Sequence, residues 1–264
     1  MFRFLPLASS SKGNSVYLGT ETEGILFDAG IGPRSLQSAL KLGGIQSVEA
    51  IKAIFITHEH SDHIKGLLSL TEKIDVPVYG SRETLVELIH KEAVTPHTQL
   101  FEIKRRTVTV ADYAVRCFST SHDSVHSLGY QITLPNGVQA ALCTDLGVVT
   151  PEVHTILLGC DAVMLESNYD RELLRTGRYP YYLKERIASE HGHLCNDDCA
   201  AELVKLIGNG TKQVILGHLS EENNRPELAA KTAIEALTKA GFVIETDYHL
   251  LTAPRTTAGQ FLTL

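Results

Sequence analysis

The chain has 264 residues, 43% of them hydrophobic and 21% charged, and its net charge is −7. This length fits one large α/β domain or two small ones. The acidic balance argues against broad, nonspecific coating of nucleic acid, which relies on a basic surface. It does not exclude a nuclease, because two bound divalent cations would supply positive charge where phosphate binds.

Short apolar or alternating segments predict strands at residues 25–27, 53–56, 76–79, 113–118, 138–142, 161–166, 213–216 and 242–245. Strands are expected to fill residues 100–142. Helical periodicity predicts helices, at residues 36–42, 64–72, 81–92, 183–190, 197–208 and 226–240. Residues 9–15 read as a small-residue loop between strands. Strands that are first adjacent and later separated by helices predict an α/β fold of two sheets between helical layers.

Neither the membrane nor the secretory pathway is indicated. No apolar stretch approaches transmembrane length, and no signal-peptide pattern opens the chain. Five irregularly spaced cysteines suit reduced thiols. These features predict a cytoplasmic protein.

Residues 57–63, T-H-E-H-S-D-H, are the most informative stretch, because H-x-H-x-D-H packs metal-binding groups behind a predicted strand. Four donors in six residues exceed what one tetrahedral ion takes from so short a segment. The pattern therefore suggests two ions, with His58 and His60 facing one and Asp62 and His63 the other. A surface histidine cluster is the alternative, which the density of the pattern disfavours.

Three later strands also end in a histidine or an aspartate, followed by glycine or polar residues: His122, Asp145 and His218. A lone histidine at such a position is more often a surface or core residue. The ordered repetition of strand-end donors favours metal ligands instead.

With these motifs the chain resembles the metallo-β-lactamase superfamily, whose ligand order is H-x-H-x-D-H, then His, Asp, His. The resemblance implies a four-layer αββα sandwich over residues 1–264, as a single domain without a cap-domain insertion. It also implies the ligands: His58, His60 and His122 on the first metal, Asp62, His63 and His218 on the second, and Asp145 bridging both. This donor set accepts zinc, manganese or iron.

Further segments resemble the YycJ (WalJ) subgroup of the superfamily: residues 9–15, 122–123 with 129–130, 165–170, 192–196, and 217–224 with 226–229. That subgroup is associated with 5′→3′ exonuclease activity on DNA. The chain departs from the subgroup at Tyr169, where histidine is usual, and at Cys195, where serine is usual.

The resemblance also implies a catalytic set of His193, Glu166 and Asp62, the last being a metal ligand as well. His193 follows the strand-end Glu166 as in the Glu–His pair of ribonuclease Z. Glu166 would orient the imidazole, which would then protonate the leaving group. A surface histidine before a helix is the alternative for His193. Asn196 is the expected N-cap of that helix.

Asp28 ends a strand in the sequence Asp-Ala-Gly. The resemblance suggests that its carboxylate supports a metal-bound histidine. A turn, which favours aspartate before glycine, explains the residue almost as well. Residues 179–186 interleave tyrosines with lysine and arginine. Such a set would stack a base and hold a phosphate, or simply pack in a half-buried loop.

The function predicted is a dinuclear metal-dependent phosphodiesterase, a 5′→3′ exonuclease acting on DNA. The alternative is a small-molecule hydrolase of the same fold, acting on a cyclic phosphodiester, a thioester or a lactone. A di-iron redox protein is a third reading, disfavoured because His60 is retained. The Glu166–His193 pair favours phosphate chemistry, since an acyl hydrolase does not need it.

Overall fold

The computed structural model describes residues 1–104, 107–256 and 260–264. The chain divides into two compact units, each built around strands of one mixed sheet. The first unit comprises Met1–Cys117, Ser124–Leu128 and Ala253–Leu264, and the second comprises Phe118–Asp123 and Gly129–Thr252. Residues 105–106, inside the predicted strand region, lie outside the described residues. The single domain over 1–264 stays a prediction.

The first unit contains a seven-stranded sheet in the order β14-β1-β2-β3-β4-β5-β6. Its strands are β1 (Arg3–Ser10), β2 (Gly13–Gly19), β3 (Gly24–Phe27), β4 (Ile51–Phe55), β5 (Val78–Gly80), β6 (Leu100–Glu102) and β14 (Leu262–Thr263). Neighbours from β14 to β3 pair antiparallel, and those from β3 to β6 pair parallel. The carboxyl ends of the parallel strands therefore meet at one edge, where the H-x-H-x-D-H segment begins.

The register of the parallel strands also aligns a row of aromatic side chains. Phe27, Phe55, Tyr79 and Phe101 occupy successive paired positions. Their ring centroids are 5.6, 4.8 and 5.4 Å apart in that order. Such cross-strand aromatic pairs fix the register, because a one-residue slip would place every side chain on the opposite face.

Helices cover one face of this sheet with leucine and isoleucine side chains. They are α1 (Pro33–Leu42), α2 (Ser61–Ile64), α3 (Leu67–Thr71) and α4 (Arg82–His90), and a 3₁₀ turn at Val48–Ala50 leads from α1 into β4. The predicted helix over 64–72 is split into α2 and α3 near Gly66. A Cβ atom at Gly66 would lie 2.0 Å from the backbone oxygen of Ile31, so the chain can pass there only as glycine.

The second unit holds five strands in the order β13-β12-β11-β10-β9. They are β9 (Leu128–Thr133), β10 (Gln139–Cys143), β11 (Ala162–Glu166), β12 (Gln213–Gly217) and β13 (His249–Thr252). β9 is antiparallel to β10, and the others run parallel. Cys143 pairs with Leu165 and Glu166 with Gly217, so the residues that follow these strand ends are neighbours. Upstream, β7 (Val108–Val110) and β8 (Tyr113–Ser119) form an antiparallel hairpin.

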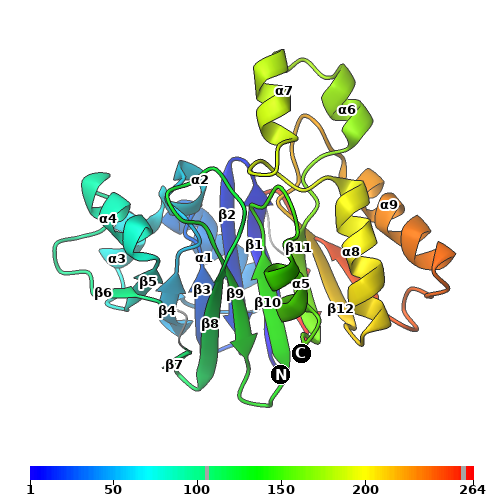
Figure 1. The fold of residues 1–264 in the computed structure, drawn as a ribbon. Coiled ribbons are helices and arrows are strands. Elements are labelled where there is room, and N and C mark those ends of the chain that lie inside the picture. The colour runs from blue at the N-terminus through cyan, green and yellow to red at the C-terminus, as the bar shows by residue number, and fades with distance from the viewer. Residues whose placement is uncertain (105–106, 257–259) are drawn as a thin grey trace. The chain divides into compact units, whose positions relative to one another are not determined.

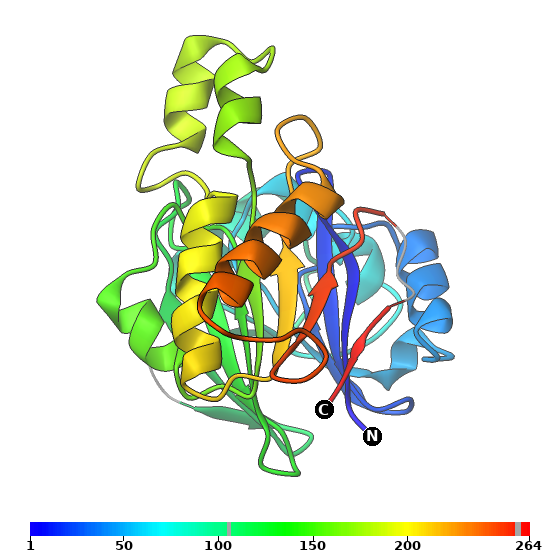
Figure 2. The same cartoon turned by 90° about the vertical axis from the view of Figure 1, so that its right-hand side faces the viewer.

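Three helices pack on the strands of the second unit: α5 (Pro151–Leu157), α8 (Asn196–Gly208) and α9 (Pro226–Lys239). Figure 2 shows α8 and α9 side by side across the strands. The remaining two helices, α6 (Arg171–Thr176) and α7 (Tyr181–Ile187), stand away from the sheet as a hairpin (Figure 1). No residue of α7 is buried.

Several sequence predictions about elements were wrong. No strand forms at 242–245, where only Ile244 makes an isolated bridge, to Tyr248. The strand in this part of the chain is β13, at His249–Thr252. By contrast, the helix expected near 183–190 is present, with its bounds shifted to Tyr181–Ile187. Residues 9–15 lie mostly within β1 and β2, which leaves a very tight turn. The short helices α5 and α6 were missed, since seven or six residues give little periodicity.

In the described part of the chain, no helix combines the length and the apolar composition that crossing a bilayer requires. All five cysteines are buried and have free thiols.

Candidate functional site

Three strand-end residues of the predicted site have an unusual backbone. Asp28, Asp145 and His218 have φ angles of 57°, 58° and 54°, in the left-handed region. Side chains other than glycine rarely adopt it, and each such residue costs on the order of 1–3 kcal/mol. Strain of this kind persists where surrounding contacts enforce it, and it clusters at functional sites.

The first unit brings four predicted ligands together on the segment that follows β4. His58 and His63 are fully buried, whereas the side chains of His60 and Asp62 are 31% and 21% exposed. The His58 ring lies 4.6 Å from that of His60 and 4.0 Å from that of His63, between centroids. His63 Nε2 lies 3.4 Å from an Asp62 carboxylate oxygen. Asp62 and His63 thus present their donors side by side.

Asp28 holds one of these histidines from behind. Nδ1 of His63 lies 2.8 Å from Oδ2 of Asp28, and the other oxygen accepts from the backbone N–H of Thr57 at 2.8 Å. Since a carboxylate only accepts, Nδ1 carries the proton and Nε2 keeps its lone pair for a metal. Burial raises the pKa of Asp28, although His63 and Thr57 oppose this by charge and hydrogen bonding. The contact between Asp28 and His63 favours the role that the resemblance suggested for Asp28, a carboxylate behind a metal-bound histidine.

Replacing Asp28 with asparagine should lower metal affinity about 10–100-fold, the usual effect of losing a carboxylate behind a metal-binding histidine. Titration against a chelating dye measures the affinity. Asp75→Asn, an exposed carboxylate of the same unit, is the control and should change nothing. Unchanged affinity in a folded Asp28→Asn protein would show that Asp28 serves only the turn.

Asn14, which no motif had singled out as a site residue, contacts the same donors. Its amide nitrogen donates to Oδ2 of Asp62 at 3.1 Å and lies 3.0 Å from Nε2 of His63. Its position depends on a close backbone approach at Gly30, whose N–H donates to the Asn14 carbonyl. A Cβ atom at Gly30 would lie 1.7 Å from the Asp62 carbonyl oxygen, so only glycine allows it.

The second unit brings together the other three predicted ligands. An Asp145 oxygen lies 3.4 Å from Nδ1 of His218 and 3.8 Å from Nε2 of His122, and all three side chains are almost completely buried. Nδ1 of His122 faces the Gly192 carbonyl at 3.0 Å and therefore donates. Burial lowers the pKa of His122 despite the Asp145 charge. A neutral imidazole with Nε2 unprotonated is the form that binds a metal.

Glu166 connects a predicted ligand to the predicted acid. Its Oε1 lies 2.9 Å from Nδ1 of His193 and 2.7 Å from Nδ1 of His218. Its Oε2 accepts from the backbone N–H groups of Leu146 and Leu194, at 3.0 and 3.2 Å. Complete burial raises the pKa of Glu166, but the two histidines outweigh this and hold it well below its usual range. The carboxylate stays ionised and orients both rings. Sequence reasoning anticipated only the contact with His193.

His193 is the most accessible member of this cluster, with 21% of its side chain exposed. Its ring centroid lies 5.0 Å from that of His122 and 5.1 Å from that of His218. The donor atoms of Asp145, Glu166, His193 and His218 all fall within 4.8 Å of one another. Because Glu166 engages Nδ1, Nε2 is the nitrogen that can face a substrate.

A network of buried amides holds the loops that carry these residues. Asn168 donates to the His218 carbonyl at 2.7 Å, and Asn224 donates to the carbonyls of Ser167 and Asn168. Asn196 belongs to the same network, since it donates to the Asn224 side chain at 3.0 Å. The prediction that Asn196 caps α8 is therefore wrong.

The cap of α8 is Cys195, whose Sγ accepts from the Asp198 N–H. Cys195 also forms an isolated β-bridge with Tyr169 and packs in one small apolar cluster with it. The two departures from the subgroup pattern are therefore neighbours in the fold. A larger ring at one position and a thiol at the other pack against each other.

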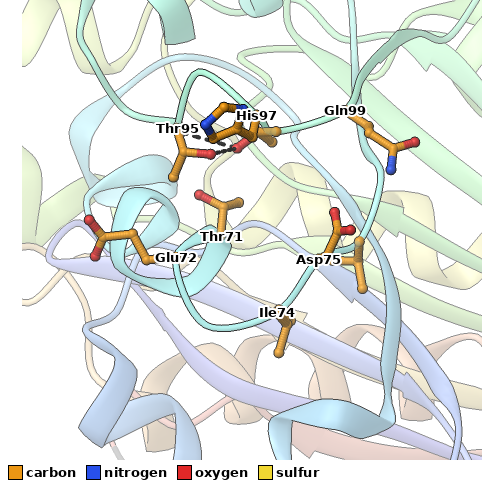
Figure 3. A pocket seen from close by; sticks show the side chains of 9 residues that line it. Thr71, Glu72, Ile74, Asp75, Thr95, His97 and Gln99 are labelled. Atoms are coloured by element: carbon orange, nitrogen blue, oxygen red, sulfur yellow. Dashed lines mark hydrogen bonds between the residues drawn. The ribbon is translucent and has the colours of Figure 1, made fainter.

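A separate pocket of about 350 Å³ opens in the first unit (Figure 3). It lies between the end of α3, with Thr71 and Glu72, and the loop that carries Thr95, His97 and Thr98. The two loop hydroxyls, Thr95 and Thr98, hydrogen-bond to each other at 2.8 Å. None of the predicted site residues lines this pocket, so it is not part of the site described above.

The family and the fold class predicted from the sequence are both confirmed by known proteins. The Beta-lactamase superfamily domain matches residues 23–219. Exodeoxyribonuclease YycJ of Bacillus anthracis is 38% identical over 240 residues, which are 90% of this chain and 90% of that protein. Exodeoxyribonuclease WalJ of Streptococcus pneumoniae serotype 2 is 36% identical over 260 residues, 97% of this chain and 96% of its own.

Among solved structures, the crystal structure of Zn(2+)-bound PqqB from Methylobacterium extorquens has the same fold, with a TM-score of 0.73 over 100% of both chains at 16% identity. Both sheets observed here are mixed and flanked by helices, as in that fold. Since the family match spans most of the chain and the two relatives match nearly end to end, the chain belongs to the beta-lactamase superfamily.

Proposed function

We propose that this protein is a dinuclear metal-dependent phosphodiesterase that degrades DNA from the 5′ end. The observation that carries the proposal is the Glu166–His193 pair at 2.9 Å, set among strand-end donors. A positioned imidazole beside metal ligands suits the protonation of an alkoxide leaving group. The names of the two relatives, both exodeoxyribonucleases, support nucleic acid as the substrate.

The seven predicted ligands fit divalent metal ions. Three of their imidazoles, those of His63, His122 and His218, have Nδ1 engaged by an oxygen at 2.7–3.0 Å, which leaves Nε2 for coordination. Such outer hydrogen bonds fix the tautomer of metal-bound histidines. Mixed imidazole and carboxylate donors suit zinc, manganese or iron. In our proposal, the seven predicted ligands would hold two ions, with Asp145 as the ligand that both ions share.

When bound, two such ions supply a hydroxide near neutral pH and absorb charge on the phosphate oxygens. The chain itself has three tasks. Asp62 and the histidine ligands would hold the ions that bind the reacting phosphate. Glu166, ionised and buried, aligns the His193 ring. His193 Nε2 then gives its proton to the oxygen that leaves.

The five free, buried cysteines fit a reducing compartment, so we place the enzyme in the cytoplasm. There, a soluble nuclease meets DNA directly. Buried thiols also resist metal capture, because burial raises the pKa of Cys143 and Cys199.

The metal-loaded protein should shorten 5′-labelled DNA by releasing the labelled nucleotide first, because cleavage starts at that end. On 3′-labelled DNA, the label should remain in a shrinking fragment. Gel electrophoresis of both substrates, beside RNA of the same sequence, measures polarity and sugar preference. A chromogenic thioester serves as the comparison substrate. Rapid thioester hydrolysis with every phosphodiester left intact would overturn the proposal in favour of an acyl hydrolase.

A further inference from the structure

The helical hairpin α6–α7 is inserted at the edge of the proposed catalytic cluster. It leaves the sheet just after Glu166 and returns just before His193, and these two side chains are bonded to each other at 2.9 Å. The bridge between Tyr169 and Cys195 closes its base. Figures 1 and 2 both show the two helices projecting beyond the end of α8. The hairpin is therefore anchored within a few residues of the proposed acid.

The first helical turn of α7 exposes two large aromatic side chains. Tyr181 and Tyr182 are 75% and 72% exposed, more than any other large hydrophobic side chain among the described residues except Met1. The sequence left open whether these tyrosines pack in a half-buried loop. The structure excludes that role for both, since α7 buries no residue. Two adjacent large rings exposed in this way mark a candidate interaction surface.

The segment that carries these rings is basic overall. Residues 171–187 contain five basic and two acidic side chains, a net charge of +3 in a chain whose net charge is −7. Arg178 is exposed, and no ion pair or hydrogen bond forms at its side chain within the described part of the chain. A basic, aromatic surface on an acidic protein is complementary to a polyanion with stacking groups.

One face of α7 is directed toward the proposed site. Arg186 pairs with Asp123, the residue that follows His122. Residues four apart lie on the same face of a helix, so Tyr182 is aligned with Arg186, roughly 6 Å further along the axis. A strand with its phosphate near His122 would thus reach the ring of Tyr182 within a nucleotide or two.

We infer that the tip of α7 is a binding platform for single-stranded nucleic acid, on which Tyr181 and Tyr182 stack unpaired bases of the strand entering the site. This inference rests on the proposed nuclease function and names the form of its substrate. Aromatic stacking requires exposed base faces, which an unpaired strand presents along its length and a duplex presents only at its ends. Arg178 and Lys184 contribute charge near the phosphates.

The absence of tryptophan from the chain gives a direct test. In Tyr182→Trp, a phosphorothioate oligothymidylate, which resists cleavage, should quench the single indole fluorescence as a base stacks on it. The same sequence as a blunt duplex should quench far less. Ile89→Trp is the matched control, because Ile89 is 58% exposed on α4 and should report no quenching.

The pair Tyr181→Ala/Tyr182→Ala should weaken oligothymidylate binding roughly 5- to 100-fold, the loss expected when one or two stacked bases lose their platform. Turnover of a bis-p-nitrophenyl phosphate should not change, because that substrate does not reach α7. Tyr181→Phe/Tyr182→Phe should keep the affinity, since stacking needs the ring and not the hydroxyl. Ile89→Ala should bind normally.

The outcomes separate this inference from the proposed function. Cleavage of DNA with no quenching and full affinity of the alanine pair would overturn the platform and leave the nuclease standing. Quenching without cleavage would support the platform and remove the nuclease. If the alanine pair instead turned a dimer into a monomer on size-exclusion chromatography, the tyrosines would be a contact between copies of the chain, and the platform would fall.

Discussion

Asp145→Ala should reduce the metal content from two ions per chain to one or fewer and slow phosphodiester hydrolysis by about 10³-fold or more, because a pair of ions supplies several kcal/mol of transition-state stabilisation. In the second unit, one Asp145 oxygen lies 3.4 Å from the His218 ring and 3.8 Å from the His122 ring. Asp62 belongs to the first unit, so Asp145 is the carboxylate among the predicted ligands of the second unit. Elemental analysis and steady-state kinetics measure the two losses.

The matched control for this variant is Asp197→Ala. Asp197 is an exposed carboxylate at the start of α8, in the same unit, and its ion pair with Arg171 is also exposed. Its loss should change neither metal content nor rate, since exposed pairs contribute little. Asp145→Ala should keep the circular-dichroism spectrum of the unsubstituted protein. Two ions retained at full activity would disprove the bridging role.

Much of this site was predictable because the fold places it at strand ends. His58, His122, Asp145 and His218 each follow a short apolar run, and such runs are the strongest local signal for a strand. Parallel strands then bring their carboxyl ends to one edge, whatever the exact register. The order of these donors along the chain resembles that of the metallo-β-lactamase superfamily, and this resemblance implied the ligand set.

Contacts between distant loops were not predictable in this way. Glu166 lies 52 residues from His218, and Asn14 lies 49 residues from His63. Which carboxylate faces which ring depends on strand register and on close approaches such as that at Gly30. A single sequence shows neither. Two short helices, α5 and α6, were missed for another reason, since seven and six residues give little periodicity.

These contacts change what can be learned from Glu166. Sequence reasoning assigned it to His193 alone, so Glu166→Gln should have weakened only the acid. Because Oε1 also holds Nδ1 of His218, the glutamine variant is now expected to lower metal content as well. Substitution of His193 itself is the cleaner test of the acid.

His193→Ala should cut turnover of DNA by about 10²–10⁴-fold, the usual contribution of general acid catalysis. Metal content should stay unchanged, because His193 is not among the seven proposed ligands. On a bis-p-nitrophenyl phosphate the loss should be far smaller, since that leaving group barely needs a proton. Rates on both substrates, measured beside elemental analysis, give the comparison.

His249→Ala provides the control, because His249 pairs with Glu245 on an exposed part of the same unit and should affect neither substrate. The leaving-group contrast is decisive because a defect in binding or folding slows both substrates alike. A missing acid slows only the reaction whose leaving oxygen is a strong base. Equal losses on the two substrates would take His193 out of the acid role, and a parallel fall in metal content would make it an eighth ligand.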